Sequence, residues 1–76
     1  MKLKDFDTIN SSARTIYNVY DDEMNHLYSF SVDYTNKDEE FCKSLDEKMK
    51  LIEYGANVEY INVDALTKFL KVAVSV

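Results

Sequence analysis

Two early segments of the chain carry the hydrophobic pattern of paired β-strands. Residues 13–20 are rich in β-branched and aromatic side chains, which favour strands. Residues 26–34 alternate between apolar and polar positions, as a half-buried strand does. A polar turn over residues 21–25 separates the two segments, so the pattern predicts a β-hairpin. The predicted apolar face of the second strand consists of His26, Tyr28, Phe30, Val32 and Tyr34.

A long helix is predicted over residues 36–55. Its apolar positions recur at steps of four, four and three residues, which places them on one face of a helix. Asn36 and Glu39 have the spacing of a capping box at the start. Gly55, the only glycine of the chain, falls where a left-handed residue ends a helix. The predicted apolar stripe comprises Phe41, Leu45, Met49 and Ile52.

The same region allows one alternative. The helix could end near Leu45, and residues 49–54 would then form a further strand. The unbroken apolar stripe favours the single long helix over this alternative.

Three further elements complete the predicted fold. Residues 2–9 carry apolar side chains at three-residue spacing, which indicates a short helix. Residues 58–63 and 68–76 have the composition of strands and are joined by a turn near residues 64–67. We therefore predict one α+β domain over residues 1–76, with a four-stranded antiparallel sheet in ββαββ order, one long helix on one face and a short N-terminal helix.

Negative charge is concentrated in one window of the chain. Residues 21–40 contain seven acidic residues and one lysine, a net charge of −6 in a chain whose net charge is −5. Such a surface can dock on a basic partner, and exposed tyrosines beside it are typical of interface hot spots. The alternative is a solvated turn followed by a helix start with favourable charge. The predicted partner-binding residues are Tyr17, Tyr20, Asp21, Asp22, Glu23, Asp38, Glu39 and Glu40.

Six of these acids form two clusters, residues 21–23 and residues 38–40, near opposite ends of the second predicted strand. About a dozen residues at a rise of about 3.3 Å each separate the clusters by roughly 30 Å. Because this separation exceeds the Debye length of about 8 Å, the two clusters are not expected to act as one patch in a monomer.

The C-terminal segment carries no charge after Lys71. An apolar strand at a sheet edge invites pairing with another chain, so the segment predicts homodimerisation. The alternative is a central strand that is already paired on both sides. The predicted oligomer interface consists of Phe69, Leu70, Val72 and Val74.

Reactive side chains are scarce. The chain has one histidine, one cysteine and one glycine, too few for a typical metal site, a catalytic triad or a phosphate-binding loop. We therefore expect no enzymatic activity, no cofactor and no metal. His26 is expected to be exposed or half-packed, and Cys42 to be a buried structural residue.

Composition also narrows location and partners. A lone cysteine forms no internal disulfide, which is typical of a reducing cytoplasm. Residues 1–5 lack the apolar core of a signal peptide, and no apolar stretch approaches the roughly 20 residues that span a bilayer. Acidity argues against direct nucleic-acid binding. We expect a cytoplasmic protein of a bacterial host cell, without membrane contact.

Small size, acidity, frequent lysine, asparagine and tyrosine, and the ββαββ pattern give the chain an overall character. In this character it resembles accessory proteins of phages and mobile elements in low-GC bacteria, among them anti-defence inhibitors such as anti-CRISPR proteins. The resemblance implies a non-enzymatic protein-binding inhibitor or modulator, which would engage a basic partner through the surface around residues 21–40. No single residue is carried over from a family.

A second hypothesis comes from another functional class. The chain would be an oligomer that sequesters a nucleotide-like ligand between its subunits. Arg14, lysines and tyrosines at the seam would supply phosphate and stacking contacts.

Overall fold

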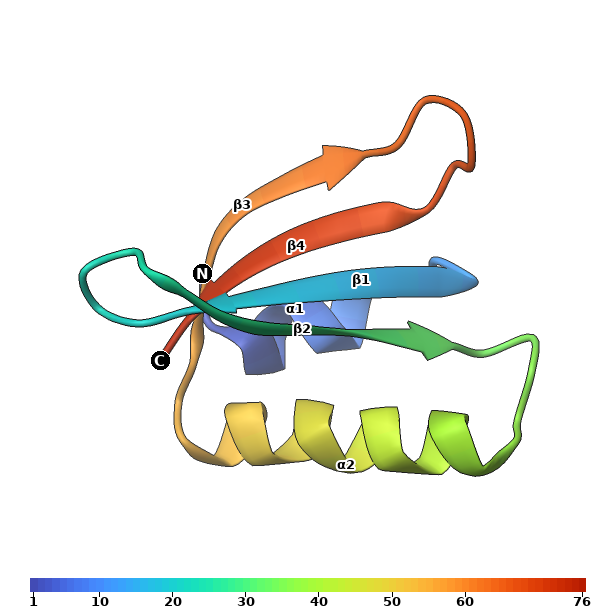
Figure 1. Ribbon diagram of the computed structural model, residues 1–76, viewed down its shortest axis with the longest axis horizontal. Coiled ribbons are helices and arrows are strands. Elements are labelled where there is room, and N and C mark those ends of the chain that lie inside the picture. Colours follow the sequence, from blue (N-terminus) through green and yellow to red (C-terminus); the bar gives the residue numbers. More distant parts are fainter.

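The computed structural model describes residues 1–76 and consists of two helices and one four-stranded sheet (Figure 1). This confirms the α+β class and the predicted order of elements along the chain. Neither helix is long and apolar enough to span a membrane. The elements are α1 (Leu3–Ile9), β1 (Arg14–Tyr20), β2 (His26–Asp33), α2 (Glu39–Glu53), β3 (Asn57–Val63) and β4 (Leu70–Ser75).

The sheet is mixed, so the prediction of an all-antiparallel sheet is wrong. Its strand order is β2-β1-β4-β3. The pairs β1–β2 and β3–β4 are antiparallel hairpins, whereas the central pair β1–β4 is parallel. Because β2 and β3 therefore run in the same direction at opposite edges, the chain must return along the sheet between them, and α2 makes this return (Figure 1).

The central position of β4 overturns the predicted oligomer interface. Strand β4 pairs with β1 on one side and β3 on the other, so it offers no free edge to a second copy. Val72 and Val74 are buried in the core. Leu70 is half-buried against that core, and the ring of Phe69 lies 4.6 Å from Arg14 Cζ. The segment Phe69–Val76 is thus largely a structural strand.

The long helix starts later than predicted. Asp38, not Asn36, is its N-cap, and Asp38 Oδ1 accepts a hydrogen bond from the Phe41 amide at 3.1 Å. At the other end Gly55 adopts a φ of 73°, which confirms the predicted left-handed stop. Residues 49–54 continue the helix up to Glu53, so the alternative of an extra strand is wrong.

The buried face of α2 is rotated relative to the predicted stripe. Met49 is exposed, whereas Lys48 and Leu51 are buried. Phe41 and Ile52 are half-buried against the core, as the stripe predicted. A lysine therefore occupies the middle of the packed face.

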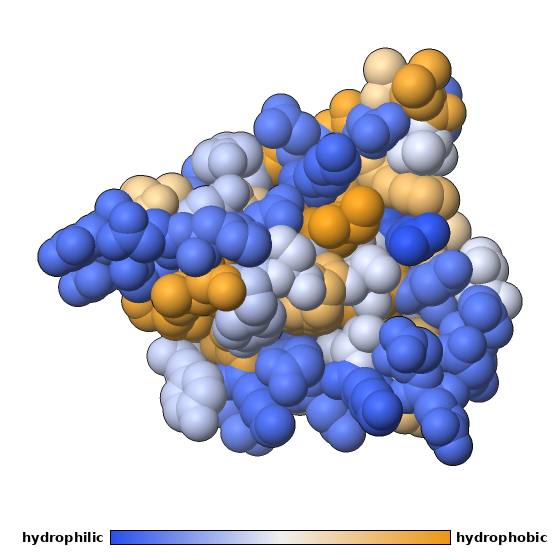
Figure 2. Space-filling view, viewed as in Figure 1, coloured by the Kyte–Doolittle hydropathy of each residue, from blue (hydrophilic) through white to orange (hydrophobic).

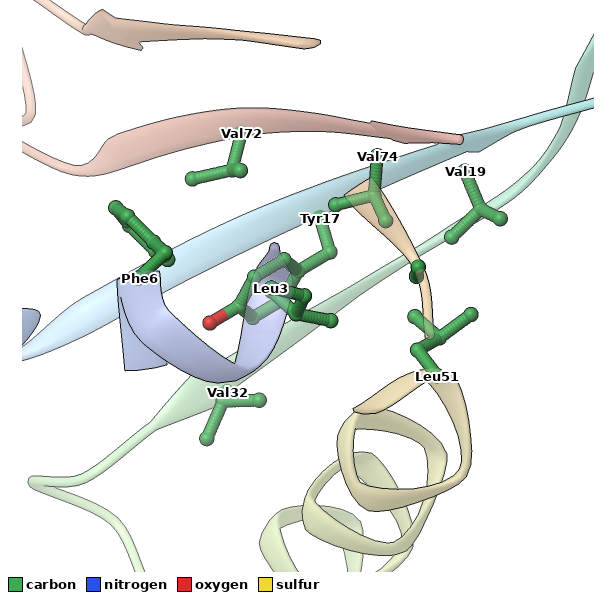
Figure 3. Close-up of a cluster of buried hydrophobic side chains, with 9 residues drawn as sticks. Leu3, Phe6, Tyr17, Val19, Val32, Leu51, Val72 and Val74 are labelled. Atoms are coloured by element: carbon green, nitrogen blue, oxygen red, sulfur yellow. The ribbon is translucent and has the colours of Figure 1, made fainter. Parts of the chain in front are cut away.

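The core lies between the sheet and the two helices, around Tyr17 of β1 (Figure 3). Figure 3 shows Leu3 and Phe6 reaching in from α1, Leu51 from α2, and valines from β1, β2 and β4. Both helices pack on this face of the sheet and none covers the other (Figure 1), so side chains on β1 alternate between buried and half-buried positions. The buried apolar cluster comprises Leu3, Phe6, Tyr17, Val19, Val32, Leu51, Ala56, Val72 and Val74.

A bulge near the start of β2 reverses one predicted orientation. Val19 pairs with Tyr28, but the next residue, Tyr20, pairs with His26, so Leu27 is an extra residue in β2. This places His26 on the open face of the sheet, where its Nε2 lies 2.7 Å from Ser29 Oγ. His26 therefore does not share a face with Phe30, as the alternation had predicted, but it is exposed as expected.

Candidate functional site: acidic residues and a groove beside strand β2

The acidic residues of the 21–40 window have no ion-pair partner. The chain has three ion pairs, and none of them includes an acid of this window. No internal ion pair therefore prevents these carboxylates from binding an external cation. The three ion pairs are Lys48–Asp7, Lys50–Glu47 and Lys71–Asp64.

Residues 21–23, which we call the turn acids, lie in the β1–β2 turn. Asp21 organises this turn, because its Oδ1 accepts hydrogen bonds from the amides of Glu23 at 2.9 Å and Asn25 at 2.8 Å. The Asn25 amide is the main cause that holds the pKa of Asp21 below its usual range. Asp22 and Glu23 are exposed and their carboxylates make no hydrogen bond. Among the turn acids, only Asp22 and Glu23 therefore have side chains free of internal hydrogen bonds.

The second group, which we call the helix-end acids, surrounds the start of α2. Asp38 is committed to the N-cap, and Asp33 Oδ1 accepts the hydroxyl and the amide of Thr35 at 2.6 and 2.9 Å. The Thr35 hydroxyl is the largest cause that lowers the pKa of Asp33. Glu39 and Glu40 are exposed in the first turn of the helix. The helix-end acids are Asp33, Asp38, Glu39 and Glu40.

The two acid groups lie at opposite ends of the molecule. Figure 1 shows the β1–β2 turn at the left and the start of α2 at the right. The longest dimension of the molecule is 32 Å. The structure thus agrees with the expectation that the groups do not form one patch, and each group is a separate candidate surface.

A hollow of about 560 Å³ lies at the helix end and not at the turn end. One wall is the middle of β2, from Ser29 to Asp33, and the other is the first half of α2 with Phe41 and Ser44. Asp33, Asp38 and Glu40 line it together with a single cation, Arg14. We call this hollow the edge groove. It is a concave acidic surface with an aromatic side chain on each wall, Phe30 and Phe41.

The guanidinium of Arg14 is already engaged by contacts within the protein. Its guanidinium lies over the ring of Phe69, 4.6 Å from the ring centroid. Its Nε is buried and has no hydrogen-bond acceptor. Arg14 sits beside Asp33 in the strand pairing and helps to lower the pKa of that carboxyl.

The two tyrosines predicted to contact a partner differ in exposure. Tyr17 is 1% exposed and lies in the core, so the prediction that it contacts a partner is wrong. Burial raises the pKa of its hydroxyl well above the usual range. Tyr20 lies on the open face of the sheet with half-buried exposure, and a hydrogen bond with Tyr60 raises its pKa. Tyr20 remains accessible at the turn end, away from the edge groove.

The surface is hydrophilic over the β1–β2 turn and α2 and more hydrophobic at the β3–β4 turn. Figure 2 shows hydrophilic residues over the β1–β2 turn at the left and along α2 at the bottom of the view. Hydrophobic colour appears at the β3–β4 turn at the upper right, where Leu66 is 95% exposed. The acidic groups thus lie away from this apolar corner.

Cys42 is exposed on α2, so the prediction of a buried structural cysteine is wrong. It follows Phe41, which faces inward, by one residue, and this step of about 100° turns its side chain toward solvent. No three histidine, cysteine, aspartate or glutamate side chains are arranged to hold a metal ion.

A polar cluster between the helices was missed from the sequence. Lys48 Nζ lies 2.7 Å from Asp7 Oδ1 and donates to Tyr34 Oη at 2.8 Å. Burial alone would lower the pKa of Lys48, but the hydrogen bonds to Asp7 and Tyr34 raise it above its usual value. No hollow adjoins this cluster, and it joins α1, α2 and the end of β2. We assign it a structural role.

Comparison of the chain with protein-family models, with curated proteins and with solved structures finds no match.

Proposed function

We propose that the chain is a non-enzymatic protein-binding inhibitor or modulator, encoded by a phage or mobile element, that engages a basic partner through the helix-end acids. The observation that carries this proposal is the edge groove. It combines three carboxylates that have no ion-pair partner with a concave wall between β2 and α2. Like charges on a concave surface attract cations and steer their approach.

The groove is favoured over the turn acids for a physical reason. At the turn, Asp22 and Glu23 project from an exposed loop with no neighbouring concave surface. Isolated exposed charges of this kind contribute little to affinity because water and salt screen them. At the helix end, the same charge type is combined with aromatic surface from Phe30 and Phe41, and aromatic residues are enriched at protein interfaces.

The alternative of a nucleotide-sequestering oligomer receives less support. Arg14 is the one arginine available for a phosphate, but it is stacked on Phe69 and lies among three carboxylates of the groove. An anionic ligand would meet net negative charge there.

Two variants with equal charge changes test the proposal. Glu39→Lys/Glu40→Lys and Asp22→Lys/Glu23→Lys each change the net charge from −5 to −1, and none of the four side chains caps a helix or organises a turn. The tagged chain and both variants are used to capture proteins from a lysate of cells that carry the gene. We expect one basic protein to be retained by the unmodified chain and the turn variant but lost by the helix-end variant. Retention by all three would contradict the proposed site.

A further inference from the structure

We infer that the edge groove binds its partner by strand addition: an extended, lysine- or arginine-bearing segment of the partner protein pairs with the free edge of β2 and extends the sheet. This inference rests on the proposed function and specifies how the partner is held. It is carried by the hydrogen-bonding pattern of β2 and by what lies beside that strand.

The pairing of β1 with β2 shows which backbone groups of β2 face outward. The Tyr34 amide donates to the Ala13 carbonyl at 2.9 Å, and Tyr34 and Ala13 continue the register in which Asp33 faces Arg14. Hydrogen-bonded pairs alternate along an antiparallel ladder. Val32, Phe30 and Tyr28 therefore bond to β1, whereas the backbone of Ser29, Ser31 and Asp33 points away from the sheet.

These outward groups have no partner of their own apart from one weak turn contact. The amides of Ser29, Ser31 and Asp33 make no hydrogen bond outside the ladder, and the Asp33 carbonyl accepts only the Asn36 amide at 3.4 Å. The Ser29 hydroxyl is held on the open face, where it donates to Asn18 Oδ1 at 2.7 Å. The outward groups span about 13 Å at a rise of about 3.3 Å per residue.

The same three residues line the edge groove, so the unpaired backbone faces space and not packed protein. An unpaired edge of this kind is a template for another strand. The strand carries no lysine or proline, the residues that usually protect such an edge, and its side chains at these positions include two small serines. A second chain can thus approach closely.

The other edge of the sheet is a weaker candidate. The Val58 amide of β3 already donates to the Met1 carbonyl at 2.7 Å, and Lys2 forms a bridge with Asn57. A bulge at Glu59 interrupts β3 as well. No hollow is lined by β3. The N-terminal segment therefore covers part of that edge, and only β2 combines a free edge with a groove.

Charge determines the kind of segment that fits. Side chains of an added strand alternate between the two faces of the sheet. On the helix side they would meet the rings of Phe30 and Phe41 and the carboxylates of Asp38 and Glu40, and on the open side the carboxylate of Asp33. An apolar residue flanked by lysine or arginine satisfies both surroundings, whereas an acidic segment would add like charge to three carboxylates.

The test uses two synthetic heptapeptides with equal charge. One alternates lysine with valine and forms a strand. The other has the same sequence with every backbone amide nitrogen methylated, so it has no amide hydrogen to donate to the edge of β2. Amide hydrogen exchange of the chain, followed by NMR, and fluorescence anisotropy of labelled peptides report pairing and affinity.

We expect the lysine–valine peptide to slow exchange of the Ser29, Ser31 and Asp33 amides by about tenfold or more, because these amides gain hydrogen bonds. The Ile61 and Val63 amides of β3 are the internal control and should not change. The N-methylated peptide should bind at least about tenfold more weakly, a difference of about 1.4 kcal/mol.

A pair of variants gives independent evidence. Ser31→Pro removes an outward amide without removing a hydrogen bond to β1, and we expect an affinity loss of about tenfold. Val63→Pro, the matched change on β3, should leave affinity within about twofold. Circular dichroism checks that both variants fold; if Ser31→Pro does not, the exchange data and the peptide pair still decide the question.

Two outcomes would overturn strand addition. If both peptides bind alike and the Ser29, Ser31 and Asp33 amides exchange at an unchanged rate, charge alone attracts the partner, and the proposed function survives without strand pairing. If the lysine–valine peptide fails to bind at millimolar concentration, the inference is also wrong. Failure of the proposed function looks different, because Glu39→Lys/Glu40→Lys would then capture the same proteins as the unmodified chain.

Discussion

Lys48 of α2 is buried with its Nζ 2.7 Å from Asp7 Oδ1 of α1. The same nitrogen donates to Tyr34 Oη at 2.8 Å, just beyond β2. This contact fixes the position of α2 relative to α1 and β2, and α2 forms one wall of the edge groove. The ion pair thus connects the packing of the helices to the shape of the candidate site.

The first prediction concerns the stability of this pair. Lys48 is almost fully buried, whereas the Asp7 side chain is 26% exposed. Asp7→Leu leaves a buried cation without its anion and should lower the free energy of unfolding by about 3 kcal/mol. Lys48→Met leaves a carboxylate that water can still reach and should cost about 2 kcal/mol.

Urea unfolding of the two single variants and the double variant measures the coupling. Because the double variant leaves no uncompensated charge, it should be more stable than the sum of the single effects implies, by about 1–3 kcal/mol. Additive effects would contradict the structural role assigned to the pair.

The second prediction is a loss of stability at high pH. Folding raises the pKa of Lys48 and of Tyr17, so the folded state keeps protons that the unfolded state releases above about pH 10. Their contribution to stability is full below that pH and declines as the pH rises toward the folded pKa values. Urea unfolding from pH 8 to 11.5 should show this decline, and Lys48→Met should reduce its slope. An equal slope in both proteins would contradict the assignment.

The third prediction separates capping from charge at the start of α2. Asp38 accepts the Phe41 amide, whereas neighbouring Glu39 makes no hydrogen bond through its side chain. Asp38→Ala should lower the free energy of unfolding by about 1 kcal/mol, and Glu39→Ala, with the same loss of charge, by less than about 0.5 kcal/mol. Equal losses in thermal or urea unfolding would show that charge near the helix dipole, and not the cap, is responsible.

How much of this fold is visible in the sequence depends on the range of the interaction. Local signals sufficed for both hairpins and for the helix stop at Gly55, because alternation, turn composition and the left-handed position act over a few residues. The parallel pairing of β1 with β4 joins segments more than fifty positions apart, and no local pattern encodes it. The continuous apolar run of Val72, Ala73 and Val74 indicates a buried interior strand, but it does not specify the strand with which β4 pairs.

The candidate site was visible only in part. The acidic window identified the carboxylates and their division into two groups, since sequence separation alone sets that distance. The edge groove depends on the order of the strands, because β1 and β4 occupy the centre of the sheet and leave β2 at an edge. The burial of Lys48 was not predicted because lysine side chains are usually exposed. Leu51, an apolar residue outside the predicted stripe and three positions after Lys48, was the sequence signal for the true buried face.

The fourth prediction concerns the turn that follows α2. Gly55 has a φ of 73°, and an added Cβ would lie 3.8 Å from Lys2 Nζ, an ordinary contact. The cost of Gly55→Ala therefore comes from the backbone and should be about 1 kcal/mol. Gly55→Asn should cost less, because asparagine tolerates the left-handed region better. Thermal unfolding that ranked asparagine below alanine would contradict this explanation.

The central claim is that the partner binds at the helix end, and one affinity comparison tests it most directly. The labelled lysine–valine heptapeptide is titrated at fixed low salt against the unmodified chain, Glu39→Lys/Glu40→Lys and Asp22→Lys/Glu23→Lys. We expect binding to weaken about tenfold or more in the helix-end variant and to change within about threefold in the turn variant. Equal losses for the two variants, or a larger loss for the turn variant, would contradict the central claim.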